Sequence, residues 1–591
     1  MKFIRLSLFS LFVFIAIFTA CGKPSAEAKT SSDFYEEVSR LHRIMSEINL
    51  KYVEEIDPSE ITDAAISGIR SVLDPNTAVL DPKASDNLKL ATDGEYGGIG
   101  LTISIRDNML TVISPMVGTP AYNLGIMAGD KITHINGKST KDLTADESAE
   151  RLRGKIGTEV TVTIMREGAV APFDIKITRA KIVVHAVTFA DMLDKDIGYI
   201  QLAAFNVKTA TELEDVINKL KKRGMKKMVL DLRSNPGGLL NQAIEVSELF
   251  LKSGNRIVST RGRVVNSEHN ATRNGIVGED MQIAVLVNQG TASAAEIVSG
   301  ALQDWDRAIV VGKTTFGKGS VQTVYPFDYD GRALKLTTAF YYLPFGRCIN
   351  KPEYGIRGRG MRAAAASEDS DESKDAAKDT AVRDTQVFFT ANGRRMFGGG
   401  GITPDVEIEQ KPIPWIAQVQ ERQALYFRFA VKYRSHLGDL AAKVDSTWQP
   451  PDSMFNAFRA FYMADTNFTK VKSPARTLTD AVEETLLREQ NIIHGDTSKV
   501  LKDTLIAAKL AAFVNALTKQ NETQALEIKN YSINAIRREL IAAAQGSEAS
   551  IAWTLRDDAQ LAEALKYLRN ESLYKSKMKA QPKSKKPNDK K

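Results

Sequence analysis

Residues 283–302 read IAVLVNQGTASAAEIVSGAL, an apolar run followed by a polar turn and then by a segment of helical composition. The β-branched run Ile283–Val287 predicts a short buried strand, and Ala294–Leu302 predicts a helix. Ser293 is therefore expected at a strand-to-helix turn. Since the first turn of a helix presents main-chain N–H groups that can stabilise an oxyanion, the stretch predicts an α/β domain with a serine nucleophile.

A serine hydroxyl is a weak nucleophile and needs a neighbouring base. The six histidines of the chain lie in no recognisable triad motif. Lys318 follows Ser293 by 25 positions, between two glycines, and Gln322 lies four residues further on. Burial in an apolar pocket can lower the pKa of a lysine from about 10.4 by several units. We therefore predict Lys318 as the base and Gln322 as the holder of its amine. The alternative is that Ser293 caps a helix and Lys318 is a surface loop residue.

Together these segments resemble the carboxyl-terminal processing (tail-specific) protease family, whose members use a Ser–Lys dyad with an assisting Gln. The resemblance assigns these roles to Ser293, Lys318 and Gln322. A second block, residues 229–238 (VLDLRSNPGG), has the apolar strand and Asn-Pro-Gly-Gly turn that in this family contributes to the oxyanion hole. The resemblance implies that the N–H of Gly237 or Gly238 and the N–H of Ala294 form that hole.

Two further positions match the family in a looser way. Asp304 matches an acidic position that some members need for activity; the alternative is a helix-end residue in a structural ion pair. Arg153 matches a position that could couple a peptide-binding domain to the catalytic site.

One segment partly matches the sequence pattern of a phosphate-binding loop. Residues 312–318 fit the first seven places of a phosphate-binding loop, but Gly319 stands where the loop needs Ser or Thr. Because no hydroxyl is offered to Mg²⁺ and no long apolar helix follows, the sequence argues against nucleotide binding.

Residues 93–180 contain short strand patterns and the glycine-containing opening YGGIGL at 96–101. The order of their motifs resembles a PDZ domain, which captures a peptide C-terminus by adding it as a strand to a sheet edge. The resemblance places the carboxylate loop at Gly98, Ile99, Gly100 and Leu101. Apolar side chains there, with Ile103 and Leu152, predict a preference for an apolar C-terminal residue.

The chain is expected to be a multidomain α/β protein. Residues 32–90 predict N-terminal helices, and residues 181–410 alternate strands and helices, for which the resemblance implies a crotonase/Clp-like core carrying the inserted PDZ domain. Residues 361–384 predict a mobile acidic insertion, because their composition cannot bury a core. Residues 411–574 predict a helical C-terminal domain for dimerisation, gating or partner contact.

The N-terminus predicts export. Residues 1–21 contain a basic start, an apolar run and small residues before Cys21, which resembles a lipobox with Cys21 as the lipidated residue. Ordinary signal cleavage is the alternative. The expected location is the periplasm or cell envelope, with a lipid anchor in the outer membrane. Since Cys348 is the only other cysteine, no intramolecular disulfide framework is expected.

The net charge of +7 is located in one place. Residues 575–591 contain eight lysines and one aspartate, which predicts a basic disordered tail and leaves the rest of the chain formally neutral. No nucleic-acid partner is therefore expected.

The function expected from the sequence is a serine endopeptidase that recognises protein C-termini, without a metal or organic cofactor. Its expected partners are proteins with apolar C-termini, the membrane through the lipid anchor, and a homo-oligomer or adaptor through the C-terminal helices. The alternative is a non-catalytic PDZ scaffold of the cell envelope.

Overall fold

A computed structural model describes residues 31–327, 330–351, 386–409, 412–437, 448, 451–471 and 525–579, with scattered helical residues between 477 and 513. The predicted signal and Cys21, the acidic insertion 361–384 and most of the basic tail lie outside the described residues. No helix in the described ranges combines the length and the apolar character that crossing a membrane requires.

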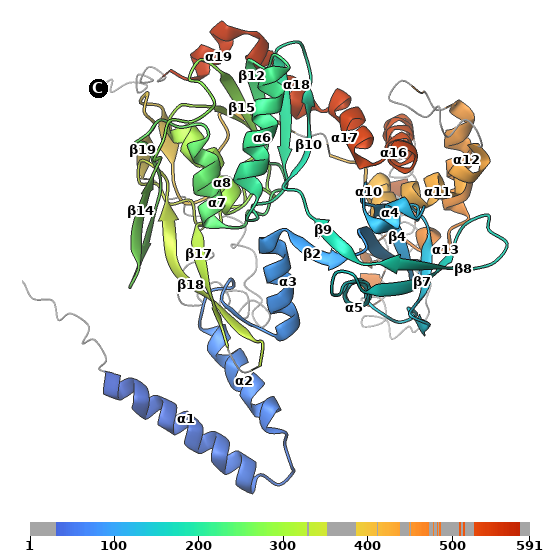
Figure 1. Cartoon of the computed structure of the whole chain (residues 1–591), viewed down its shortest axis with the longest axis horizontal. Coiled ribbons are helices and arrows are strands. Elements are labelled where there is room, and N and C mark those ends of the chain that lie inside the picture. Colours follow the sequence, from blue (N-terminus) through green and yellow to red (C-terminus); the bar gives the residue numbers. More distant parts are fainter. Residues whose placement is uncertain are drawn as a thin grey trace, which may run out of the picture. The chain divides into compact units, whose positions relative to one another are not determined.

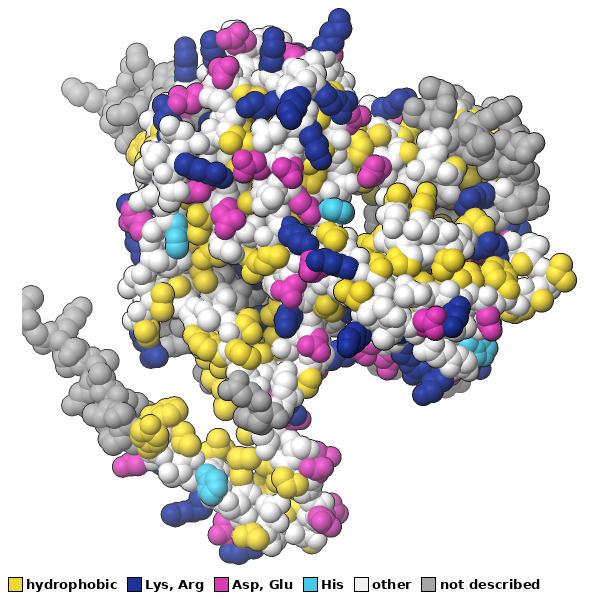
Figure 2. Space-filling view, in the orientation of Figure 1, with side chains coloured by type: hydrophobic (Ala, Val, Ile, Leu, Met, Phe, Trp, Pro, Cys, Tyr) yellow, Lys and Arg dark blue, Asp and Glu magenta, His cyan; other side chains and the backbone are white. Residues whose placement is uncertain are grey.

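The N-terminal unit contains α1 (Ser31–Lys51) and α2 (Pro58–Ser71). Asp57 caps α2 by accepting a hydrogen bond of 2.8 Å from Ser59, and Pro58 occupies the first turn, where its missing N–H costs nothing. Large apolar side chains on α1, such as Phe34 at 67% exposure, remain on the surface, and Figure 2 shows yellow side chains along these helices. The helical periodicity is confirmed, but neither helix buries a described side chain.

The next segment is a β-rich domain that follows α3 (Pro82–Asp93). Its main sheet runs in the order β3-β4-β5-β7-β8, with β6 paired to β5, which leaves β3 at an edge. A separate pair of strands, β2 and β9, brackets this sheet in the sequence. The elements are β2 (Glu95–Gly98), β3 (Leu101–Arg106), β4 (Met109–Pro115), α4 (Pro120–Asn123), β5 (Lys131–Ile135), β6 (Lys138–Ser139), α5 (Ala145–Leu152), β7 (Glu159–Met165), β8 (Phe173–Thr178) and β9 (Ala180–Val183).

The central sheet of the molecule has six strands in the order β10-β11-β12-β15-β16-β21. All its pairings are parallel except that of β10 with β11. The four central strands β11, β12, β15 and β16 are buried on both faces, which explains their nearly unbroken apolar runs. The strands are β10 (Val187–Met192), β11 (Ile197–Leu202), β12 (Lys227–Asp231), β15 (Gln282–Val287), β16 (Ile309–Gly312) and β21 (Val406–Glu407).

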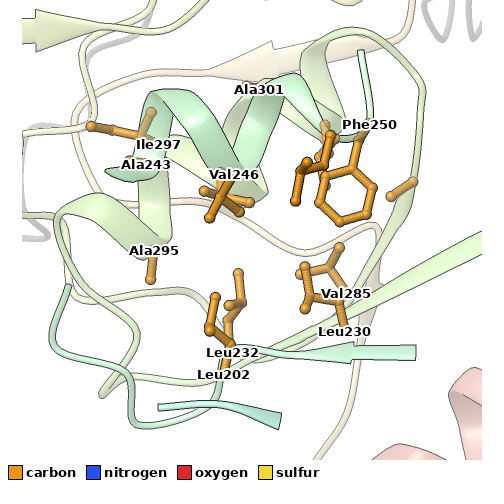
Figure 3. Packing of buried hydrophobic residues seen from close by; sticks show 14 of the residues in the cluster. Leu202, Leu230, Leu232, Ala243, Val246, Phe250, Val285, Ala295, Ile297 and Ala301 are labelled. Atoms are coloured by element: carbon orange, nitrogen blue, oxygen red, sulfur yellow. The ribbon is translucent and has the colours of Figure 1, made fainter. Parts of the chain in front are cut away.

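Three helices cover one face of this sheet (Figure 1): α6 (Thr209–Lys222), α7 (Leu240–Glu248) and α8 (Ala294–Asp304). Alternate strand residues such as Leu230 and Val285 point to these helices, where they pack against Val246 and Ala301 (Figure 3). Because the strands of this parallel sheet end at one edge, the loops after β12, β15 and β16 meet there.

The other face of the sheet is covered by the C-terminal helices α18 (Ala559–Arg569) and α19 (Glu571–Lys577). Val229, Leu286 and Val311 pack against Leu561 and Leu568 there. The predicted helical domain 411–574 therefore needs correction at its end, because the segment from Leu555 onward packs on the central sheet. The predicted tail is corrected likewise: α19 extends to Lys577, and Met578 is buried.

A second sheet contains β13, β14, β17 and β18. In it β17 pairs with β18, and β18 pairs with β13, which pairs with β14. Its strands are β13 (Arg256–Gly262), β14 (Asn266–Asn270), β17 (Ser320–Pro326) and β18 (Ala333–Tyr342), and a separate hairpin is formed by β19 (Val387–Phe389) and β20 (Arg395–Phe397).

The remaining C-terminal helices gather around an aromatic cluster in which Tyr426 stacks on Phe458 with ring centroids 4.9 Å apart. They are α10 (Trp415–Arg422), α11 (Leu425–Leu437), α12 (Asp452–Met463), α13 (Thr466–Thr469), α16 (Ala525–Gln545) and α17 (Ser547–Thr554).

Candidate active site

Ser293 lies at the turn between β15 and α8, where the sequence predicts it. Its backbone has φ 53° and ψ −116°, a region that residues with a side chain rarely adopt. Such strain persists only where the surrounding structure imposes it, and it is common at functional sites. Ser293 is half-buried, whereas Ala294 behind it is fully buried. The turn therefore presents the serine side chain from a fixed backbone.

Glu296 ties this turn to the loop that carries Lys318. Its Oε2 accepts hydrogen bonds from the main-chain N–H groups of Ser293 (2.8 Å) and Lys318 (2.9 Å). Its Oε1 accepts from the N–H of Gly317 (2.7 Å) and from the Thr315 hydroxyl. Glu296 is fully buried, and this burial raises the pKa of its carboxyl, while the hydrogen bonds act in the opposite direction. Oε2 thus bonds to both catalytic candidates, and Oε1 holds the loop residues directly before Lys318.

Tyr341 on β18 supports the same two residues through their carbonyl groups. Its hydroxyl lies 3.2 Å from the carbonyl oxygen of Ser293 and also contacts the carbonyl oxygen of Lys318. The ring is buried in the main core, and burial raises the pKa of the hydroxyl well above its usual value. Neither Glu296 nor Tyr341 was among the residues singled out from the sequence. The Ser-x-x-Glu spacing of Ser293 and Glu296 was the available signal.

Gln322 lies on β17, at a register shift between Val321 and Gln322. Its side-chain Nε2 donates to the hydroxyls of Ser320 (2.8 Å) and Thr337 (3.3 Å). This arrangement orients the carboxamide, so that its oxygen is the atom suited to accept a hydrogen bond from an amine.

The Asn-Pro-Gly-Gly turn lies against the serine turn. Gly237 has φ +93°, and a Cβ added to it would come within 2.8 Å of the Ser293 Cβ and of the Ala294 nitrogen. The turn is held by the Ala292 N–H, which donates to the Asn235 carbonyl at 2.9 Å. Because the Gly237 N–H donates to the Asn235 side chain at 2.8 Å, the geometry favours Gly238 as the oxyanion donor of the two.

Asp304 occupies the opposite end of α8 from Ser293. At a rise of about 1.5 Å per residue, the length of this helix separates the two residues by roughly 16 Å. Asp304 is paired with Arg347 at 2.7 Å, and both side chains are no more than 2% exposed. The structure therefore favours the structural alternative for Asp304 over a catalytic one.

The residues predicted for peptide binding form the start of the edge strand β3. Gly98 ends β2, Leu101 opens β3, and the connection is fixed by hydrogen bonds to the Ile99 carbonyl (3.0 Å) and the Gly100 carbonyl (2.9 Å). Ile99 and Leu152 belong to the domain core, and Leu101 and Ile103 are half-buried against it.

Arg153 lies at the C-terminal end of α5. Its guanidinium donates to Asn87 on α3 at 3.1 Å and lies 5.3 Å from the centre of the Tyr96 ring. Arg153 thus links α5 to α3 and β2 rather than to Ser293 or Lys318.

Comparison with known proteins shows the family of this chain. The family model for peptidase family S41 matches residues 196–357, and that for the PDZ domain matches residues 97–177. The carboxy-terminal-processing protease of Bartonella bacilliformis is 40% identical over 342 residues, covering 57% of this chain and 78% of the relative. The chain belongs to the carboxy-terminal-processing protease family. It is a serine peptidase of family S41 with a PDZ domain.

Two further similar proteins are a curated relative and a solved structure. The carboxy-terminal processing protease CtpA of Bacillus subtilis is 37% identical over 325 residues, covering 55% of this chain and 69% of CtpA. Among solved structures, the photosystem II D1 C-terminal processing protease is 26% identical, with a TM-score of 0.34 over 62% of this chain and 86% of that one.

Proposed function

We propose that this chain is a C-terminal processing endopeptidase that uses Ser293 as nucleophile, Lys318 as general base and Gln322 as the residue that orients the lysine. The observation that carries this proposal is the shared anchoring of Ser293 and Lys318 by Glu296 and Tyr341. Main-chain groups of the two residues are held by the same buried side chains, which keeps the two backbones close to each other, and a nucleophile and its base must lie close together.

In this proposal the neutral Lys318 amine takes the proton of the Ser293 hydroxyl as Oγ attacks the scissile carbonyl, and then returns a proton to the leaving amine. The Gly238 and Ala294 N–H groups receive the oxyanion of the tetrahedral intermediate. The Gln322 carboxamide oxygen accepts from the lysine amine. The parallel sheet with the serine turn at its carboxyl edge supports the proposed crotonase/Clp-like core.

Substrates would be selected by their C-termini. The edge strand β3 offers an unextended side of its sheet to an added peptide strand, and the connection at Ile99–Gly100 would bind the terminal carboxylate. Half-buried Leu101 and Ile103 favour an apolar last residue.

We further propose that the protein works in the cell envelope, with a lipid anchor at Cys21 and oligomer or adaptor contacts through the C-terminal helices. The sequence features of residues 1–21 support this location. The alternative of a non-catalytic scaffold predicts tail binding without turnover.

The test uses the chain without residues 1–21, an unfolded reporter with an apolar tail, and the same reporter with a charged tail. We expect cleavage of the apolar-tailed reporter at lower substrate concentration, and loss of cleavage with retained tail binding in Ser293→Ala. Tail binding by a parent that cleaves neither reporter would instead support the scaffold. Equal cleavage of the two reporters would contradict tail selection.

A further inference from the structure

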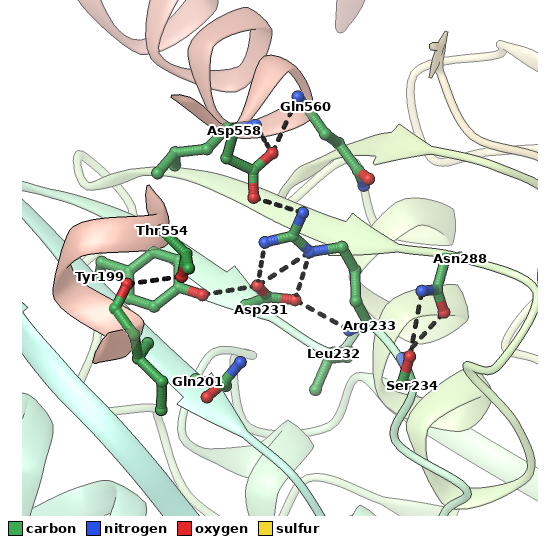
Figure 4. A network of polar contacts seen from close by, with 12 residues as sticks. Tyr199, Gln201, Asp231, Leu232, Arg233, Ser234, Asn288, Thr554, Asp558 and Gln560 are labelled. Carbon is green, nitrogen blue, oxygen red and sulfur yellow. Dashed lines mark hydrogen bonds and ion pairs between the residues drawn. The ribbon is translucent and has the colours of Figure 1, made fainter. Parts of the chain in front are cut away.

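The C-terminal helix α18 lies on the face of the central sheet opposite α7 and α8. Its N-terminal end contacts Arg233, just before the Asn-Pro-Gly-Gly turn (residues 235–238), which we call the oxyanion turn. Asp558, the N-cap residue of α18, forms an ion pair with Arg233, with 2.6 Å between Oδ2 and Nη1. The exposed fractions of the two side chains are 16% and 18%, so water screens this pair little. Figure 4 shows Asp558 and Asp231 on either side of the Arg233 guanidinium.

Arg233 also holds the end of β12, directly before the oxyanion turn. Its guanidinium donates to both oxygens of Asp231, at 2.6 to 3.0 Å, and its main-chain N–H donates to the same carboxylate at 2.9 Å. The hydroxyl of Tyr199 donates to Asp231 at 2.6 Å. Burial acts against the charge of Arg233, yet its hydrogen bonds with Asp231 and the charges of Asp231 and Asp558 raise its pKa. The guanidinium therefore stays charged while it is held between the two carboxylates.

A second α18 side chain supports the other turn. The Gln560 amide donates to the carbonyl groups of Val287 (3.0 Å) and Val311 (2.9 Å), the first of which ends β15 directly before the serine turn. Gln560 is 3% exposed. Gly312 is required beside it, because a Cβ at that position would lie 2.2 Å from the Gln560 amide nitrogen.

The two turns are also bonded to each other. Asn288 accepts from the Ser234 N–H at 2.8 Å, and the Thr291 hydroxyl donates to the Leu232 carbonyl at 2.8 Å. Because Asp558 and Gln560 hold the starts of the two turns, they also hold the two turns in position relative to each other.

We propose that Asp558 and Gln560 are positioning residues of the peptidase reaction, through which the C-terminal helix α18 holds the oxyanion turn and the serine turn in register. This inference rests on the proposed roles of Ser293 and Gly238. A displacement of about 1 Å at a reacting group can lower the rate about a hundredfold, so a small shift of either turn is sufficient to affect turnover.

The test compares Asp558→Asn with Asp194→Asn. Asparagine is as good an N-cap as aspartate, so Asp558→Asn keeps the cap of α18 and removes the charge and the acceptor oxygen that face Arg233. Asp194 forms another ion pair with this helix, to Arg569 at 3.0 Å, away from both turns. Gln560→Met removes the two amide donors at similar volume.

We expect Asp558→Asn and Gln560→Met to lower kcat about tenfold with KM changed less than about twofold, a smaller loss than that of an oxyanion donor. Asp194→Asn should leave kcat unchanged. Equal losses in Asp194→Asn, or kcat within about twofold of the parent in both α18 variants, would overturn the proposal.

Amide hydrogen exchange separates this inference from the proposed function. Faster exchange confined to residues 234–238 and 288–293 in Asp558→Asn, but absent in Asp194→Asn, is expected whether or not the parent cleaves the reporter. Unchanged exchange in these turns would overturn the positioning role. Cleavage that survives Ser293→Ala would overturn the proposed function alone.

Discussion

The main-chain N–H of Lys318 donates a hydrogen bond of 2.9 Å to the carboxylate of Glu296, at the start of the helix that follows Ser293. The same carboxylate oxygen accepts from Ser293. The proposed base and the proposed nucleophile come from loops after different strands, and one buried carboxylate bonds to the backbones of both.

Replacing Glu296 with Gln tests this anchor. An amide has only one acceptor oxygen, so its NH₂ group would face two of the four donors that the carboxylate satisfies. Each buried donor left unsatisfied costs about 1–3 kcal/mol. We expect a lower melting temperature, measured by calorimetry, and a loss of kcat in reporter cleavage that exceeds what the unfolded fraction explains. The exposed Glu279→Gln is the control, and a Glu296→Gln variant with the parent's kcat would refute the anchoring role.

Tyr341→Phe removes the hydroxyl and keeps the ring in the core. Loss of one hydrogen-bonding group costs about 1 kcal/mol of unfolding free energy, which is small beside the effect of a shift in the relative position of Ser293 and Lys318. We therefore expect a clear fall in kcat with a melting temperature close to that of the parent. Parallel losses of stability and activity would instead point to a packing role.

Gly237→Ala places a methyl group 2.8 Å from the Ser293 Cβ, at a φ of +93° that alanine adopts with strain. We expect turnover to fall by about a hundredfold or more, because the serine turn must move. Gly254→Ala is the matched control, since Gly254 has a similar φ of +86° and a Cβ there meets no atom within 4 Å. Normal turnover in Gly237→Ala would show that the two turns are not in close contact in solution.

Asp304→Asn separates the two readings of that residue. Breaking a buried ion pair costs about 3–5 kcal/mol, so we expect a marked loss of stability by denaturant unfolding. The fraction that remains folded should cleave with the parent's kcat at low temperature. A stable but inactive variant would restore the catalytic interpretation.

The hydrogen bonds between Tyr574 on α19 and Ile283 on β15 should be lost at alkaline pH. The Tyr574 hydroxyl exchanges hydrogen bonds of 3.0 Å with the N–H and carbonyl of Ile283, and burial raises its pKa to about 12. A tyrosine in the unfolded chain has a pKa near 10, so the folded state keeps the Tyr574 proton up to a higher pH than the unfolded state does. Its contribution is therefore complete below about pH 10 and is lost as the pH rises toward 12. Tyr574→Phe should unfold with a shallower pH dependence across this window than the parent.

The sequence was most informative where a function is encoded in a short local pattern. Strand, turn and helix around Ser293, and the glycine-containing opening of the PDZ domain, were visible because turn chemistry and periodicity are local. The role of Glu296 was less visible, because the Ser-x-x-Glu spacing indicates a helix start and not a bond to a distant loop.

The place of α18 could not be predicted for a different reason. Periodicity shows that a helix buries one face, but not which surface covers it. Leu561 and Leu568 fit a separate helical domain as well as they fit the back of the sheet. The pairing of Arg233 with Asp558 joins two segments far apart in the chain, and neither segment carries a local sign of the other.

The central claim is that Ser293 and Lys318 act as a pair, and the most direct measurement is reporter cleavage by Lys318→Ala beside Ser293→Ala and the exposed Lys252→Ala. The account predicts that both site variants lose turnover to a similar extent, retain tail binding and melt near the parent's temperature, while Lys252→Ala cleaves normally. Substantial turnover by Lys318→Ala would contradict the account, because a base other than Lys318 would then activate the serine.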